Sequence, residues 1–314
     1  MYAIKTNKAA LLALSQGEFY QAQLLFRKNV MKNLSAMTLN NLGSFYIFEG
    51  IYTNKDSCRR ANKLGISYLQ KAIAHQPLSL SFIALGHACF ELQEFEGAVS
   101  NFGKAYELNV NHATLYNLAM SFYRIGAYDN AMLWFNKAIN LCEKPNSFFT
   151  DPDSFYEQSE YFDTHTSYLF SLLQIDKIRC HKEIRVLFEN DSRDLYLDRF
   201  ILAYLCDDLP LAESQIKMVL EYWKTDIPVT AMIFDCLIEL GNNDVAQNYL
   251  NNAIESYEDM KYNVKAEVTK LKKMFAQADY RRSIISTFQF TKPLIAQCCY
   301  YGCELHQHSV ICPS

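Results

Sequence analysis

The sequence predicts an all-α fold in which helix pairs stack side by side, followed by a short irregular tail rich in cysteine and histidine. Half of the 314 residues are apolar and 20% are charged, which is typical of a globular chain with a large buried core. Tyr and Phe number 21 each, whereas Gly and Pro number 10 and 7, a balance that favours long helices over a turn-rich β fold. Related segments also recur at a regular interval, which indicates a repeat array.

The clearest repeat lies in the first half of the chain. Residues 81–108 and 114–141 align with a constant offset of 33 residues. One Ala-aromatic-Ala motif occurs in many amphipathic helices, but several matches at one offset indicate a true repeat. The matched pairs are Leu85 with Leu118, Phe95 with Tyr128, Ala98 with Ala131, Phe102 with Phe135, and Ala105 with Ala138.

This pattern resembles the tetratricopeptide repeat, in which a Leu-Gly pair marks the first helix, a glycine and an aromatic residue mark the turn, and alanines flank an aromatic residue on the second helix. Leu85-Gly86 matches the pair, and Gly126 with Tyr128 matches the turn. Small residues such as Gly86 and Ala98 would lie where two helix backbones approach closely. The resemblance implies a right-handed α-α superhelix whose concave face is lined by the first helix of each pair.

Two further units can be placed in the first half. Gly17, Phe19 and Ala22 indicate a unit near residues 3–35, and Asn41-Leu42-Gly43 opens the next one, whose second helix is expected at 64–77. Residues 53–62 are additional to the usual turn, so we expect a surface loop there. Sel1-like repeats, which also have long loops, are an alternative that the rest of the sequence does not favour.

The second half follows the same scheme less regularly. Three apolar positions recur at an interval of 34 residues: Ala212, Ile216 and Val219 match Ala246, Leu250 and Ala253. This spacing predicts units near 193–226 and 227–260, and a capping helix at 261–283. Prolines and turn formers at 142–154 predict a break. The expected organisation is therefore N-terminal repeats at 1–145, an irregular joint with a degenerate repeat at 146–192, C-terminal repeats with their cap at 193–280, and the tail at 281–314.

The concave face of such an array usually takes an extended peptide or a partner helix. Asn41 and Asn117 occupy the same repeat position, and a carboxamide can both donate hydrogen bonds to a peptide backbone and accept them from it. We therefore predict a non-catalytic scaffold that binds a protein or a peptide, unless these amides are only solvated surface groups. The positions that the resemblance assigns to the binding face are Asn41, Ser44, His87, Tyr116, Asn117, Met120 and Arg124, with Phe48 and Glu91 beside them.

The tail contains side chains that a repeat array does not require. Cys298, Cys299, Cys303, His306, His308 and Cys312 lie within 15 residues. Thiolate and imidazole groups at this density are ligands for Zn²⁺ or Cu(I), and the predicted set is Cys299, Cys303, His306, His308 and Cys312. A metal- or redox-responsive protein is therefore an alternative function. Disulfides in the tail, acylation of Cys298 and Cys299, and an unstructured or processed appendage remain open.

Other functions are less favoured. The 30 basic and 34 acidic side chains give a net charge of -4, so charge provides no reason to expect nucleic acid or an anionic membrane surface as a partner. The sequence contains no secretory signal and no run of about 18 apolar residues that would span a membrane, and cysteines scattered through the body favour a cytoplasmic protein. It also lacks a phosphate-binding loop, a nucleophile elbow and a metalloprotease helix, so we expect no enzyme and no cofactor apart from the metal ion at the tail.

Two more specific binding roles can be assessed by resemblance. The carboxylate clamp that holds chaperone C-termini needs basic residues on successive first helices, and residues 83–91 provide no basic pair although Asn41 is present. Chaperone-tail binding is therefore not expected. A peptide-sensing regulator similar to the helix-rich quorum receptors is a third candidate, but such receptors carry an N-terminal effector segment, for which we expect no room before the first repeat.

Overall fold

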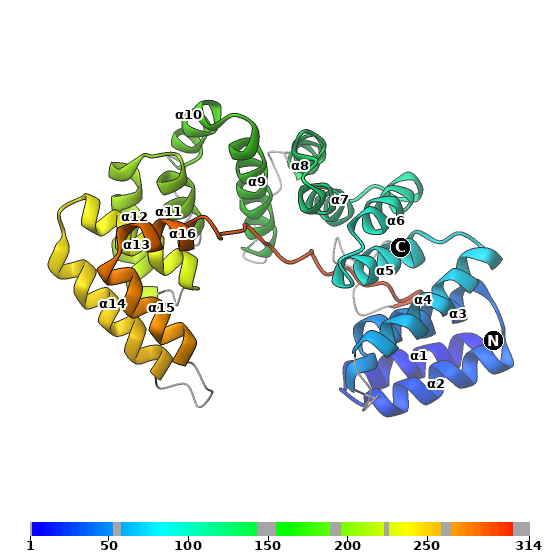
Figure 1. Cartoon of the computed structure of the whole chain (residues 1–314). Coiled ribbons are helices and arrows are strands. Elements are labelled where there is room, and N and C mark those ends of the chain that lie inside the picture. The colour runs from blue at the N-terminus through cyan, green and yellow to red at the C-terminus, as the bar shows by residue number, and fades with distance from the viewer. Residues whose placement is uncertain are drawn as a thin grey trace. The chain divides into compact units, whose positions relative to one another are not determined.

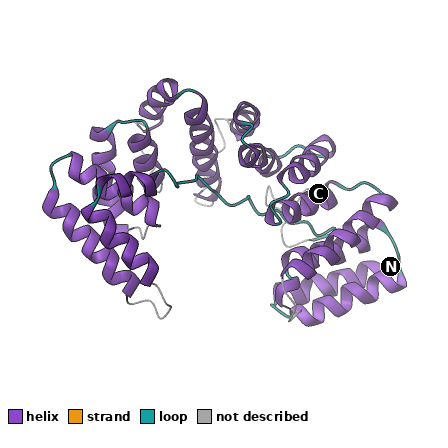
Figure 2. Ribbon diagram, viewed as in Figure 1, coloured by secondary structure: helices purple, strands orange, loops and turns teal. Residues whose placement is uncertain are grey.

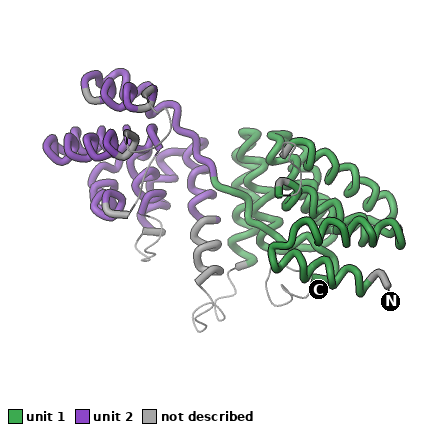
Figure 3. Tube along the Cα trace, turned by 90° about the horizontal axis from the view of Figure 1, so that it is seen from below, with its two compact units in different colours: residues 1–154, 292–314 green, residues 155–291 purple. Residues whose placement is uncertain are grey.

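The computed structural model describes residues 2–52, 58–142, 155–188, 196–222, 226–258 and 265–303. Within these ranges the chain consists of helices and their connections, without a strand (Figure 1; Figure 2), as the sequence predicts. None of the described helices is both long enough and apolar enough to cross a membrane. The chain forms two compact units: unit 1 comprises residues 1–154 together with 292–314, and unit 2 comprises residues 155–291 (Figure 3).

Unit 1 contains four helix pairs in chain order. They are α1 (Tyr2–Ser15) with α2 (Phe19–Lys32), α3 (Ala36–Phe48) with α4 (Cys58–His75), α5 (Ser79–Glu91) with α6 (Phe95–Leu108), and α7 (His112–Ile125) with α8 (Tyr128–Cys142). The second helix of each of the first three pairs also packs against the first helix of the next pair. This is the stacking of a helical repeat array.

One expected loop is partly helical. The sequence indicates a surface loop at 53–62, but α4 already begins at Cys58 and thus includes the second half of that stretch. The reason is that Arg59, Arg60, Ala61 and Asn62 continue the helical pattern of the residues after them, with Ala61 and Asn62 buried. Residues 53–57 lie outside the described part of the chain.

Small residues allow the paired helices to approach closely. A Cβ atom built on Gly86 would lie 2.6 Å from a ring carbon of Phe102, and one built on Gly65 would lie 2.9 Å from the carbonyl oxygen of Gly43. Ala98, Phe102, Ala105, Ala131, Phe135 and Ala138 are completely buried. Small residues therefore lie at the helix contacts, as predicted, and Phe102 fills the space beside Gly86 within its own helix pair.

Unit 2 continues with three further pairs and two terminal helices. The pairs are α9 (Phe155–Ile175) with α10 (Lys177–Phe188), α11 (Tyr196–Leu205) with α12 (Leu209–Tyr222), and α13 (Ile227–Glu239) with α14 (Asn243–Glu258). The single capping helix expected at 261–283 is instead α15 (Lys265–Ala276) and α16 (Ala278–Ile285), because the chain is extended at Gln277. Of the irregular joint and degenerate repeat expected at 146–192, α9 and α10 form one helix pair, and residues 146–154 and 189–192 lie outside the described ranges.

A buried ion pair attaches α16 to the body of unit 2. Arg281 Nε donates to Asp235 Oδ1 at 2.6 Å, and its Nη1 donates to the carbonyl oxygen of Met274 at 3.2 Å. The hydroxyl of Tyr204 donates to the other oxygen of Asp235 at 2.8 Å. After α16, the ring of Phe290 stacks on Phe170 of α9 with 3.8 Å between centroids. The chain then passes into unit 1.

Candidate functional site

The segment Lys292–Cys303, here called the C-terminal segment, lies along the first helices of the pairs in unit 1 (Figure 1). Asn117 of α7 donates from Nδ2 to the carbonyl oxygen of Ile295 at 2.9 Å, and its Oδ1 accepts the N–H of the same residue at 2.8 Å. In an extended chain the N–H and C=O of one residue point to the same edge. One carboxamide can therefore satisfy both groups, since it carries a donor and an acceptor side by side.

Asn41 of α3 makes the same pair of contacts six residues further along the segment. Its Nδ2 donates to the carbonyl oxygen of Tyr301 at 2.9 Å, and its Oδ1 accepts the N–H of Tyr301 at 2.6 Å. Asn7 of α1 donates to the same carbonyl at 2.9 Å and accepts a hydrogen bond from Asn41 at 2.7 Å. The backbone of Tyr301 is thus held by two side chains.

Further contacts lie between these two positions. The carbonyl oxygen of Cys299 accepts hydrogen bonds from Asn40 Nδ2 at 2.8 Å and from Ser44 Oγ at 3.1 Å. Residues 295, 299 and 301 all have odd numbers, and residues two apart in an extended chain present their backbone groups at the same edge. The C-terminal segment therefore faces the helices with one edge. We call the face of α1, α3, α5 and α7 on which it lies the groove.

Capping residues place the two asparagines at equivalent points of their helices. Asn111 caps α7 by accepting the N–H of Thr114 at 2.8 Å. Ser35 caps α3 by accepting the N–H of Thr38 at 3.3 Å, while Thr38 Oγ1 accepts the N–H of Ser35 at 3.1 Å. Such caps fix where a helix starts. Asn117 and Asn41 each follow their cap by six residues, so both side chains leave the helix on the same face.

The side chain of His87 on α5 contacts the carboxamide of Asn117. Its Nε2 lies 3.4 Å from Asn117 Nδ2, and its ring makes edge contacts with Phe48 and Phe102, both with 5.5 Å between centroids. Burial lowers the pKa of His87 to about 4, so the imidazole is neutral at pH 7. Because the N–H of Ile295 requires Asn117 Oδ1, the NH₂ group faces His87, whose Nε2 therefore accepts.

Side chains of the C-terminal segment complete an apolar cluster of unit 1. The ring of Tyr300 stacks on Phe26 of α2 with 5.8 Å between centroids and 8° between planes. Cys298 and Cys303 belong to the same cluster, whose other buried members come from α1, α2 and α3: Ala10, Leu11, Ala13, Ala22, Phe26, Leu42, Phe45 and Tyr46. The C-terminal segment is thus held in the groove both by hydrogen bonds to its backbone and by burial of its side chains.

The groove continues beyond Tyr301 as a pocket of about 310 Å³. Gly302 lines it with a positive φ of 72°, a conformation that favours glycine. The remaining lining residues come from the first three helices and the connections at their ends: Ile4, Asn7, Lys8, Asn29, Asn33, Met37, Thr38 and Asn41, together with Tyr301.

The remaining predicted groove residues differ in environment. Tyr116 and Met120 are buried, and the ring of Tyr116 contacts Phe135 of α8 edge-on at 5.6 Å. The guanidinium of Arg124 lies over the rings of Phe90 and Phe95, at 5.5 and 4.5 Å from their centroids. Asn40 and Asn7 hydrogen-bond the C-terminal segment but were not predicted. The sequence gives little indication of either residue, because Asn40 is only adjacent to the predicted Asn41 and the helix that carries Asn7, α1, matches the repeat pattern poorly.

The predicted metal ligands are only partly within the described residues. Cys299 and Cys303 are buried in unit 1, whereas His306, His308 and Cys312 lie outside the described part. Within that part, no three His, Cys, Asp or Glu side chains gather so that they could hold a metal ion. Cys298 and Cys299 are buried too, so their acylation would require the C-terminal segment to leave the groove.

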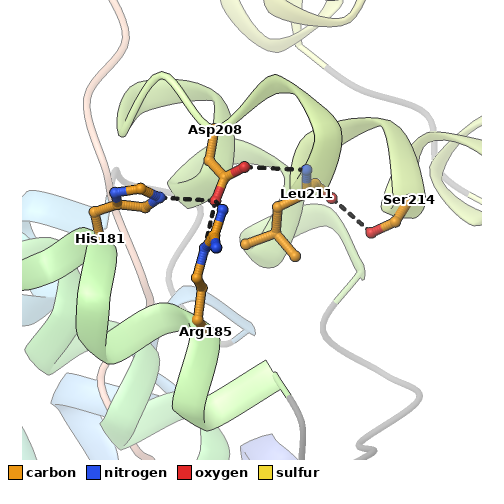
Figure 4. Close-up of polar contacts among 5 residues, drawn as sticks. All are labelled: His181, Arg185, Asp208, Leu211 and Ser214. Carbon is orange, nitrogen blue, oxygen red and sulfur yellow. Dashed lines mark hydrogen bonds and ion pairs between the residues drawn. The ribbon is translucent and has the colours of Figure 1, made fainter.

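A polar cluster in unit 2 brings a serine, a histidine and an aspartate near one another (Figure 4). Asp208 accepts hydrogen bonds from His181 Nε2 at 2.8 Å, from Arg185 Nη2 at 2.7 Å and from the N–H of Leu211 at 3.3 Å. Burial acts to raise the pKa of Asp208, but these hydrogen bonds outweigh it and lower the pKa. Ser214 donates to the carbonyl of Leu211 at 2.6 Å and does not face His181. The cluster caps α12 and is not a nucleophile-base pair.

Comparisons with known proteins agree with this architecture. A family model described as tetratricopeptide repeat matches residues 112–145, the region of α7 and α8. A tetratricopeptide repeat protein from Parabacteroides merdae superposes with a TM-score of 0.59 and 16% identity, over 88% of this chain and 100% of that one. PilF of Pseudomonas aeruginosa superposes with a TM-score of 0.51 and 15% identity, over 72% of this chain and 96% of that one.

Residues 112–145 match the tetratricopeptide repeat, and the chain has the fold of a tetratricopeptide-repeat structure. No curated protein sequence matches it, and at these identities the two structures show the fold alone. Tetratricopeptide-repeat folds generally serve as protein-binding scaffolds and not as catalysts. In unit 1, helices α1, α3 and α7 hydrogen-bond a segment of the same chain.

Proposed function

We propose that unit 1 is a non-catalytic binding module that holds an extended polypeptide segment of a partner protein in the groove. The observation that carries the proposal is the pairing of Asn117 with Ile295 and of Asn41 with Tyr301, each through a donor and an acceptor. Backbone groups are the same in every polypeptide, so this geometry suits any extended segment that lacks proline at those two positions.

Burial makes these contacts effective. Asn117 is 0% exposed and Asn41 is 1% exposed in the presence of the C-terminal segment. A buried carboxamide without a partner costs about 1–3 kcal/mol. A ligand that pairs with the asparagines avoids this cost, which supports Asn41, Asn117 and Ser44 as binding residues and His87 as the residue that positions Asn117.

The test uses the full chain with the substitutions Ile295→Pro and Tyr301→Pro, which remove the two N–H groups that Asn117 and Asn41 accept. A fluorescently labelled peptide of residues 291–303 is titrated under reducing conditions, and its anisotropy is measured. We expect saturable binding to this loosened chain and much weaker binding to the wild-type chain. In the wild type the tethered segment competes at an effective concentration in the millimolar range.

Adding Asn117→Ala to the loosened chain should weaken peptide binding by about tenfold or more, because two hydrogen bonds are lost. Asn136→Ala is the matched control, since Asn136 is exposed on α8, and we expect it to leave the affinity unchanged. Equal affinities of the loosened chain with and without Asn117→Ala would show that the peptide does not bind through this groove.

A further inference from the structure

Tyr300 is the aromatic residue of the C-terminal segment whose side chain enters the core of unit 1, beside Cys298 and Cys303. It lies between Cys299 and Tyr301, whose backbones are hydrogen-bonded to α3, and it is 7% exposed. Its ring lies parallel to that of Phe26 and in the cluster that includes Phe45 and Tyr46. The groove therefore has one position at which it accepts a large aromatic ring.

The hydroxyl group of Tyr300 does not suit this site. Its oxygen is buried and has no hydrogen-bond partner among the residues that the structure describes. Burial also raises the pKa of Tyr300 well above its usual value, so the hydroxyl keeps its proton. In water the same hydroxyl is hydrated, and placing it unpaired in an apolar site weakens binding.

The neighbouring tyrosine provides the contrast. Tyr301 is held by its backbone, and its side chain is 43% exposed. Its hydroxyl is therefore not required to leave water. Of two adjacent tyrosines, one has its side chain in the apolar cluster and the other has it at the surface, so only the first position discriminates between Tyr and Phe.

We propose that the groove selects a partner segment with Phe at the position of Tyr300, one residue before the Asn41-bound residue and five residues after the Asn117-bound residue. The C-terminal segment is then a weaker occupant that keeps the groove filled until such a segment displaces it. This inference rests on the proposed function, because it assumes that the groove binds an extended segment of another protein.

The size of the preference follows from the chemistry of one hydroxyl group. Leaving a buried hydroxyl unpaired corresponds to about a tenfold loss of affinity. An apolar pocket discriminates against an added hydroxyl to a similar or somewhat larger extent. Because the C-terminal segment is tethered, a displacing segment also needs additional contacts, and the 310 Å³ pocket beyond Tyr301 offers space for them.

The test compares three labelled peptides of residues 291–303 on the loosened full chain: the natural sequence, the Tyr300→Phe peptide and the Tyr301→Phe peptide. We expect the Tyr300→Phe peptide to bind about tenfold more tightly than the natural one and the Tyr301→Phe peptide to bind within about twofold of it. If all three bind with equal affinity, the inference is wrong but the proposed function stands. If none binds, the proposed function itself fails.

A second measurement does not depend on the folding of the loosened chain. In otherwise wild-type protein, Tyr300→Phe should slow hydrogen exchange of the Ile295 and Tyr301 amides by about tenfold, because it strengthens the closed state. Tyr301→Phe should leave both rates unchanged. Equal or faster exchange in the Tyr300→Phe chain would overturn the inference whatever the peptides do.

Discussion

Asn117 and Ile295 form a two-point contact, in which the carboxamide donates to the carbonyl oxygen at 2.9 Å and accepts the N–H at 2.8 Å. Replacing Asn117 by Ala in the full chain removes both hydrogen bonds. We expect the amide of Ile295 to exchange with solvent about 10- to 100-fold faster, as measured by NMR. Asn136→Ala should leave this rate unchanged. An Ile295 amide that exchanges equally slowly in the Asn117→Ala chain would contradict the contact.

Two glycines of unit 1 should respond in opposite directions to replacement by Ala. Ala in place of Gly usually stabilises a helix by about 0.5–1 kcal/mol, and we expect this gain for Gly103→Ala, because a Cβ there meets nothing within 4 Å. Gly65→Ala places a Cβ 2.6 Å from Ile47 and 2.9 Å from the Gly43 carbonyl oxygen. This crowding should lower the free energy of unfolding by about 1–3 kcal/mol. Chemical denaturation of both variants is the measurement, and equal shifts would exclude the close approach of α3 and α4.

Buried His87 should make stability depend on pH. Burial lowers its pKa to about 4 in the folded chain, whereas an unfolded histidine titrates near pH 6.5. Between pH 4 and 6.5 the unfolded chain binds more protons than the folded chain does. The contribution of His87 to the free energy of unfolding is therefore complete above about pH 6.5 and is lost as pH falls towards 4. From pH 7.5 to pH 5 we expect a loss of about 2 kcal/mol through this residue.

The contribution of His87 is isolated by comparing variants, because carboxyl groups also titrate in this range. In His87→Gln the loss between pH 7.5 and 5 should be smaller by the same amount, while His75→Gln, a change at an exposed histidine, should follow the wild type. Denaturation midpoints across this pH range provide the measurement. Parallel curves for wild type and His87→Gln would show that the folded chain does not hold His87 neutral.

The buried ion pair of Arg281 with Asp235 should be costly to break from one side. The two side chains are 8% and 12% exposed, and Arg281→Met leaves the carboxylate buried with only Tyr204. We expect the free energy of unfolding to fall by about 3–5 kcal/mol. Replacing all three residues together, Arg281→Met with Asp235→Leu and Tyr204→Phe, should recover most of this loss, because no buried polar group remains unpaired. A triple variant as unstable as the single one would assign the effect to packing of α16.

Much of the fold could be predicted from the sequence because the repeat signal is local. Gly86, Phe102 and Ala105 have to recur together wherever two helices approach closely, so their spacing reports the helix pairs directly. Helix boundaries were less accessible. The early start of α4 at Cys58 and the division of α15 from α16 at Gln277 occur without a glycine or proline to mark them.

The groove could be predicted only in part. Asn41 and Asn117 stand out because they share a repeat position, but nothing in the sequence indicates that residues 292–303 lie against them. The physical reason is that the contacts are made to the backbone of Ile295, Cys299 and Tyr301. Every residue carries the same backbone groups, so the sequence does not predict contacts that are made to them. The cysteines of the same segment instead predict a metal site.

The positions of Asn41 and Asn117 show how many residues of the C-terminal segment correspond to one repeat. They lie two repeats apart and bind residues six apart, so each repeat corresponds to three residues of the C-terminal segment. This agrees with helix spacings of about 10 Å and a rise of about 3.3 Å per extended residue. Three is an odd number, so an amide at the same position of the intervening repeat would face the opposite edge of the C-terminal segment. The intervening repeat has Ala84, 33 positions before Asn117, where an amide would meet the wrong edge. The two-point contacts to the C-terminal segment therefore recur after six residues, on α3 and on α7, with none from Ala84 between them.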